Sequence, residues 1–395
     1  MPEITIEVIA HDPIVARDGR PFGAGQGNQM HCLDWPLPSV VAGSFRTALV
    51  KATDKLDFTG NIPQQLLDVS ISGIFPFGNG TLYLPAPADA VGMPPKHEDA
   101  APSLLRTTPQ EVKDGGCDFP GGAPLKPVML SFDDVADDFK PATIPHWWPA
   151  DRLYDWLAGR PVNLNGRFLQ RPIEERRDHV HINARTGAAE EGQIYSTAAI
   201  NLRRLPAFTH GSAESPSYVE LSLVCRACID DGDFAHAGSL SIWHPFGGER
   251  RLAYWRSMSD EKADQIWQCP DELRSQIANA DKIRMQLVTP GIFDGGWLPG
   301  WLDRNSLEGR PFDGAPRLKL VGVSNQRWTA VSGWSLAKPR GPKPVQRMVP
   351  AGAIYFFERV EGDASSLGTH GWLRSVSDQM QNCRDGFGLA VWGTW

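Results

Sequence analysis

Residues 12–53 read DPIVARDGRPFGAGQGNQMHCLDWPLPSVVAGSFRTALVKAT, which predicts the end of a strand, a glycine-rich loop and a helix. The glycines let a backbone approach a ligand closely, and the start of the helix at Ser39 presents unpaired N–H groups that suit an anion. Arg17, Arg20 and Arg46 would surround such an anion with charge that does not titrate away. The stretch therefore predicts a site for a phosphate group.

The neighbouring segments predict the fold around this stretch. Residues 4–9 alternate between apolar and polar, as a half-buried strand does. Residues 69–77 and 81–85 flank Asn79-Gly80, which predicts a hairpin. Strand, helix and hairpin in this order make up three-quarters of a βαββαβ, ferredoxin-like unit. The second half of the chain also carries strands, a helix and glycine loops, so the pattern is consistent with an ancient duplication of one unit.

The length of 395 residues exceeds what one hydrophobic core organises, so we expect two domains. Residues 93–172 are rich in proline, glycine and aspartate and predict a long loop-rich insertion with one helix near 149–157. A second domain is expected to begin near Ser217. The predicted division is 1–216, which contains the insertion, and 217–395.

The overall charge is acidic, with a net charge of −7 and a pI of about 5.8. A free-standing nucleic-acid binder is usually basic, so the total charge counts against one, although a local basic groove remains compatible with it. The six cysteines are scattered, the N-terminus has no signal-peptide character, and no run of about 18 apolar residues is present. We expect a reduced, cytoplasmic protein that does not contact membranes.

Two further segments are basic or rich in glycine. Residues 245–251 form a second glycine-arginine loop, with Gly247, Gly248 and Arg250. Residues 333–347 contain no acid, and their prolines are expected to hold them extended along a phosphate backbone. In the predicted helix, Gly43 would let a ligand backbone approach; the alternative is that it allows close helix–sheet packing.

Residues 179–185 alternate, so His179, His181, Asn183 and Arg185 would share one strand face. Four polar side chains in step can hydrogen-bond a ligand, but the same pattern is typical of an exposed strand face.

The sequence gives little indication of a metal site or of a catalytic site. Cys225 and Cys228, with His236 or His244, invite a zinc interpretation, but no second closely spaced pair is in place, and we expect buried free cysteines. Metal-free RNA cleavage would need histidines at the scissile phosphate, and His11, His31, His179 and His181 are available. The sequence contains no GxSxG, HExxH or Walker A pattern. We expect no cofactor and no metal.

Several blocks of the chain occur in the order of one known family. They are residues 17–22 (RDGRPF), 38–46 (PSVVAGSFR), 185–187 (RTG), 191–195 (EGQIY), 247–250 (GGER), 332–334 (SGW), 349–352 (VPAG) and 386–388 (GFG). Together they resemble the RAMP superfamily, in particular the subunit that caps the crRNA 5′ end in type III-B (Cmr-type) CRISPR effector complexes. Two departures are Ala16, where the family often has an aromatic residue, and the 93–172 insertion, which matches no motif and would be either a thumb or decoration.

The resemblance implies an α+β fold of two RRM-like ferredoxin domains side by side. It implies a non-catalytic subunit that holds the 5′ repeat-derived tag of a crRNA, contacts the large polymerase-cyclase subunit and starts the filament of backbone RAMP subunits. Arginines and lysines would contact phosphates, glycines would permit close approach, and residues 179–185 would contact unstacked bases. The predicted RNA-binding residues are Arg17, Gly19, Arg20, Ser39, Gly43, Arg46, His179, His181, Arg185, Gly247, Gly248, Arg250, Lys338, Arg340, Lys343, Arg347, Gly386 and Gly388.

Two alternatives stay open at this point. One is a metal-independent crRNA-processing endoribonuclease, an activity that other members of the superfamily possess, with His31 or His179 as the residues to test. The other is a scaffold that binds only proteins.

Overall fold

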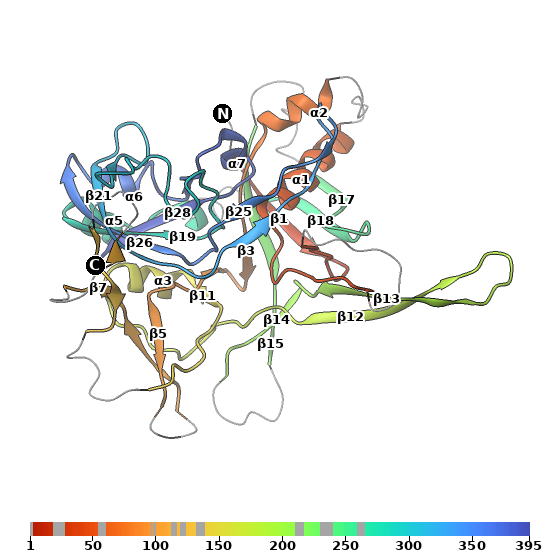
Figure 1. Cartoon of the computed structure of the whole chain (residues 1–395), viewed down its shortest axis with the longest axis horizontal. Helices are drawn as coiled ribbons and strands as arrows, with labels where there is room; N and C mark the ends of the chain where they lie inside the picture. Colours follow the sequence, from red (N-terminus) through yellow and green to blue (C-terminus); the bar gives the residue numbers. More distant parts are fainter. Residues whose placement is uncertain are drawn as a thin grey trace.

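The structure, a computed structural model, describes residues 3–18, 28–53, 61–95, 97, 100–111, 117–118, 124–131, 139–209, 217–229, 240–258 and 265–395. It is a mixed α/β protein that is rich in strands and built on two main sheets (Figure 1). The strands of the first sheet all precede residue 258, and those of the second all follow residue 281.

The first sheet has seven strands. Its order is β11 (Trp147–Pro149), β4 (Thr81–Pro85), β3 (Ser70–Gly78), β16 (Ser222–Cys228), β1 (Glu3–Ala10), β18 (Leu252–Ser257) and β17 (Ser241–Pro245). The predicted alternation of β1 is confirmed, because Ile6 and Val8 are buried in the core beneath the helix. The predicted hairpin is also confirmed: Asn79 and Gly80 at its turn both have positive φ, as a type I′ turn requires.

The strands beside β1 come from distant parts of the chain. The β3–β4 hairpin does not supply the strand beside β1; β16 lies between β1 and β3, and β18 lies on the other side of β1. The reason is the apolar face of β16, where Leu223, Cys225 and Ala227 are buried in the same core as β1. Strands after residue 217, expected in the second domain, therefore complete the first sheet.

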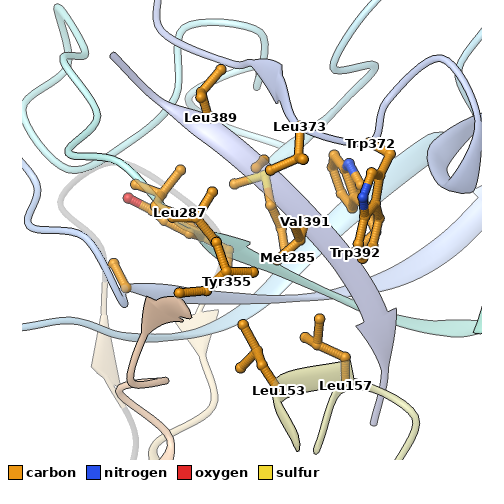
Figure 2. Close-up of a cluster of buried hydrophobic side chains, with 14 of the residues drawn as sticks. Leu153, Leu157, Met285, Leu287, Tyr355, Trp372, Leu373, Leu389, Val391 and Trp392 are labelled. Atoms are coloured by element: carbon orange, nitrogen blue, oxygen red, sulfur yellow. The ribbon is translucent and has the colours of Figure 1, made fainter. Parts of the chain in front are cut away.

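The second sheet has six strands, all from the C-terminal part of the chain. Its order is β20 (Glu308–Gly309), β21 (Arg317–Ser324), β26 (Ile354–Glu361), β19 (Lys282–Leu287), β28 (Leu389–Thr394) and β27 (Arg374–Ser375). Figure 2 shows side chains of β19, β26 and β28 gathered with Leu153 and Leu157 from a helix of the first half. One hydrophobic core therefore joins the two halves of the chain.

Helix α1 (Pro38–Ala52) packs on one face of the first sheet, with Val41, Phe45 and Leu49 buried as predicted. It begins one residue before Ser39, at a proline, whose missing N–H costs nothing at the first helical position. The other helices are short: α2 (Ile62–Gln65), a 3₁₀ turn (Leu66–Asp68), α3 (Ala150–Leu157), α5 (Asp271–Ala278), α6 (Ser365–Gly368) and α7 (Met380–Arg384). Among the described helices, none is long and apolar enough to cross a membrane.

The described parts of the 93–172 insertion are integrated into the protein. They contain the predicted helix as α3, and Trp148 and Trp156 lie in the main core. Their short strands, with β5 just before them, are β5 (Ala90–Met93), β6 (Ser103–Arg106), β7 (Thr108–Pro109), β8 (Cys117–Asp118), β9 (Pro124–Leu125), β10 (Val128–Met129) and β11. The element that projects from the body is instead the hairpin of β12 (Glu174–Ile182) and β13 (Ala189–Ile200) (Figure 1).

Candidate nucleic-acid interface

A cavity of about 710 Å³ opens beside the first half of α1. Its walls come from four separate segments: residues 15–18, the start of α1, the loop after β17, and part of residues 329–348. Six residues that the sequence predicts as RNA contacts line it: Arg17, Ser39, Gly43, Gly247, Gly248 and Lys343. The fold thus brings together residues that lie more than 300 positions apart in the chain.

Gly43 leaves the helix surface open towards this cavity. It is exposed. Apart from its two chain neighbours and the adjacent backbone of the helix, no atom of the described residues lies within 4 Å of the position that a Cβ would take. Close helix–sheet packing therefore does not explain this glycine. Ser39 and Ser44 lie on the same stretch of α1 and add hydroxyl groups to the wall.

The Gly247–Gly248 loop packs tightly against the strand segment that leads to Arg17. The Gly248 N–H donates to the Val15 carbonyl over 2.8 Å, and a Cβ on Gly247, whose φ is +76°, would lie 2.7 Å from that oxygen. This approach of protein backbone requires glycine at position 247, and a Cβ on Gly248 would lie 3.0 Å from Cγ1 of Val15. Arg17 is exposed at the end of the segment, whereas Arg250, also exposed, is not among the lining residues.

Residues 329–348 form an arm with two short ladders. β22 (Thr329–Val331) pairs with β25 (Gln346–Met348), and β23 (Trp334–Ser335) pairs with β24 (Gly341–Pro342). The expectation of a segment extended along its whole length is therefore wrong, because the chain folds back on itself. Lys338 and Arg340 are exposed between β23 and β24.

The basic residues of the arm differ in their surroundings. Lys343 lines the cavity, and the guanidinium carbon of Arg347 lies 4.7 Å from the centre of the Trp328 ring. The arm carries four basic residues and no acidic one.

Arg46 does not face the cavity. Its side chain is buried, and its Nη1 donates to Asp385 over 2.6 Å while Nε and Nη2 donate to the Val69 carbonyl over 3.1 and 2.7 Å. Asp385 is itself buried and also lies 3.5 Å from the ammonium group of Lys343. The guanidinium thus serves as counter-charge to a buried carboxylate, which sequence inspection had not singled out.

Gly386 and Gly388 follow Asp385 and are buried. Gly386 has φ +89°, and a Cβ there would lie 2.6 Å from the Ile71 carbonyl; Gly388 has φ +71° and packs on Ser377. Their conformations and close contacts require glycine for packing within the protein. Neither lines the cavity.

The projecting hairpin carries the predicted histidines. His179 stacks on Tyr195, with ring centroids 5.1 Å apart, and its Nε2 lies 2.8 Å from the Thr197 hydroxyl; His181 lies 3.5 Å from Glu190. The strand ends at Ile182, so Asn183 and Arg185 lie in the tip rather than on one face with the histidines. Asn183 accepts the Arg185 N–H over 3.0 Å and so fixes the turn.

The base of this hairpin is connected to the cavity wall. β13 pairs in parallel with β2 (Asn28–Gln29), and the Met30 N–H donates to the Ser196 carbonyl over 2.9 Å. Two residues further, Cys32 is bridged to Arg17. A continuous backbone surface therefore runs from Arg17 to the hairpin.

Some predicted positions cannot be placed or have other roles. Gly19 and Arg20 lie outside the described residues, as does His236. Cys225 and Cys228 are three apart on β16, so their side chains point to opposite faces, and burial raises the pKa of the Cys225 thiol to about 12. In the described part of the chain, no group of three or more His, Cys, Asp or Glu side chains is placed to hold a metal ion.

Comparison with known proteins identifies the family. The model of one protein family, described as CRISPR-associated protein (Cas_Cmr3), matches residues 6–395. The chain belongs to this family and is a subunit of a Cmr-type CRISPR complex. Among curated proteins, no sequence matches it.

Solved structures of type III complexes show only distant similarity. A chain of a type III-B Cmr-beta complex bound to cognate target RNA has 13% identity and a TM-score of 0.45, covering 89% of this chain and 86% of that one. A chain of the same complex bound to cognate target RNA and AMPPnP has 15% identity and a TM-score of 0.42, with the same coverage of both chains. A chain of a Csm3–Csm4 subcomplex of the type III-A interference complex has 10% identity and a TM-score of 0.32, covering 91% of this chain and 94% of that one.

Proposed function

We propose that this chain is the non-catalytic subunit that holds the 5′ repeat-derived tag of a crRNA in a type III-B effector complex. One observation carries the proposal: a single cavity collects Arg17, Ser39, Gly43, Gly247, Gly248 and Lys343 from four separate segments. In this proposal both sheets derive from βαββαβ, RRM-like units.

The chemistry of the cavity suits a phosphate of an RNA backbone. Two side chains of its wall, Arg17 and Lys343, are cationic, and one, Asp18, is anionic. Ser39 lies in the first turn of α1, where the helix dipole favours an anion, and Ser44 adds a second hydroxyl group one turn further on. The open surface at Gly43 gives a sugar-phosphate chain room to lie against the helix.

An extended polymer fits the surroundings better than a single nucleotide. The basic arm continues from one side of the cavity, and the Arg17–Cys32 bridge leads from the other side to the hairpin. The acidic total charge is compatible with this, since attraction depends on where the charges lie. We assign the remaining surfaces, including the exposed Val180, Ile182 and Ile194 of the hairpin, to contacts with the large subunit and the backbone subunit.

Salt-dependent binding of a tag-containing crRNA to the purified chain tests the proposal. Arg17→Gln and Lys343→Gln should each weaken binding and lower the slope of log K against log salt by about 0.7, the share of one phosphate contact on a single strand. Lys51→Gln is the matched control, because it removes an exposed charge from the last turn of α1, outside the cavity. Unchanged affinity and slope in both cavity variants would exclude this site.

The nuclease alternative is separated by a direct assay. The chain is incubated with repeat RNA in EDTA, and we expect the RNA to stay intact. Cleavage that disappears in His31→Ala or His179→Ala would replace the proposed role with an enzymatic one.

A further inference from the structure

Trp334 is a large aromatic side chain that lines the proposed RNA cavity. It is 60% exposed, compared with 55% for Trp243 and 50% for Trp328. A tryptophan exposed to this extent leaves apolar ring surface in water, and aromatic side chains beside a nucleic-acid groove offer that surface to bases.

The backbone that carries Trp334 is held in place. Trp334 and Ser335 pair with Pro342 and Gly341 across the β23–β24 ladder. The Lys343 N–H donates to the Gly333 carbonyl over 2.8 Å, and the Ser332 hydroxyl donates to the Lys343 carbonyl over 3.0 Å. The indole and the ammonium group of Lys343 are thus presented by the same two hairpin strands.

The other two exposed tryptophans already have partners for their rings. Arg347 lies over Trp328, and Trp243 contacts His11 edge-to-face and Tyr254 at a tilt. Within the described residues, no aromatic ring or cation packs on the face of Trp334. Its ring is therefore available to a ligand in the cavity.

We propose that Trp334 is a stacking platform for one unpaired base of the RNA tag. The base would lie on the indole while Lys343 and Arg17 hold neighbouring phosphates. This inference rests on the proposed function and names the residue that engages a base rather than the backbone. RNA is favoured over a protein partner because the arm around Trp334 is basic and carries no acid.

The test combines tryptophan variants with RNAs that each lack one base of the tag. Trp334→Ala should weaken binding about tenfold or more without changing the salt slope, because stacking releases no counterions. Trp334→Phe should retain most of the affinity. Removing the base at one tag position should weaken binding to the unmodified protein by a similar factor, and Trp334→Ala should then have no further effect with that RNA.

The control is Trp243→Ala, a comparably exposed tryptophan outside the cavity, which should bind every RNA as the unmodified protein does. The proposal is overturned if Trp334→Ala binds all RNAs normally, if its loss is the same with every base-deleted RNA, or if it impairs only assembly with other subunits. Loss of binding in Lys343→Gln and Arg17→Gln alone would leave the proposed function standing without the stacking. Normal binding in all these variants would exclude both.

Discussion

The guanidinium of Arg284 and the carboxylate of Asp89 form an ion pair of 2.6 Å in which neither side chain is exposed. Asp89 also accepts the indole N–H of Trp156 over 2.8 Å, and Arg284 donates to the Trp156 carbonyl. Burial lowers the pKa of Arg284, and the carboxylate opposes that shift. The pair thus links β19 of the second sheet to the segment after β4 and to α3.

Breaking this pair should strongly destabilise the protein. Asp89→Asn leaves a buried guanidinium without its counter-charge, which typically costs about 3–5 kcal/mol. The free energy of unfolding in urea measures the loss. The double variant Asp89→Leu with Arg284→Met should lose less free energy of unfolding than Asp89→Leu alone or Arg284→Met alone. Additive losses would show that the two charges are not coupled.

Two substitutions at Gly43 should affect folding stability and RNA binding separately. Gly43→Ala should raise the free energy of unfolding by about 0.8–1 kcal/mol, because alanine is the better helix former and its Cβ meets no described neighbour within 4 Å. Gly43→Glu should also fold, yet its carboxylate in the cavity should weaken RNA binding more than about tenfold by repelling phosphate. Lys51→Glu, at the far end of the same helix, is the control. Equal affinities of the two acidic variants would contradict the assignment.

His244 should make stability depend on pH. It is buried between β17 and α1, with Nε2 2.8 Å from the Thr47 hydroxyl, and burial lowers its pKa from 6.5 to about 4. The unfolded chain therefore takes up a proton on this imidazole near pH 6.5, whereas the folded protein takes it up only near pH 4. Stability from this group is complete above pH 6.5 and is lost as the pH falls towards 4, by up to about 3 kcal/mol. Urea midpoints between pH 4 and 7.5 should fall less steeply for His244→Gln, and an identical slope would refute this role.

The projecting hairpin should be dispensable for folding. Replacing residues 180–194 by Asn-Gly joins His179 directly to its partner Tyr195 through a two-residue turn. Because the removed side chains are mostly exposed, the thermal midpoint should stay the same. RNA affinity should fall about tenfold if His181 or Arg185 contacts the tag, since one charged hydrogen bond is worth about 1.5–3 kcal/mol. Full affinity would restrict the RNA interface to the cavity and arm.

The local elements of the fold were predictable, but the order of the strands was not. β1, α1 and the β3–β4 hairpin follow from periodicity and from one turn sequence. The pairing of β1 with β16 and β18 depends on residues more than 200 positions away, and alternation alone does not say which strands adjoin. For the same reason the predicted boundary near residue 217 does not separate the two sheets.

Only part of the candidate site was predictable from the sequence. Glycine-arginine segments pointed to Arg17, Gly43 and Gly247, which meet at one cavity. Arg46 resembles Arg17 in sequence, yet its burial is decided by Asp385, 339 positions later. Trp334 was visible only as part of a family motif, because its exposure depends on how the arm folds.

The position of β1 also has a consequence for synthesis of the protein. β1 leaves the ribosome well before the two strands between which it lies, since Ile6 pairs with Cys225 on one side and with Ser257 on the other. Until both have emerged, the backbone N–H and carbonyl groups along the two edges of β1 lack their sheet partners in the nascent chain. Release of the chain before residue 257 would leave its N-terminal strand without neighbours, in a form exposed to aggregation and to chaperones.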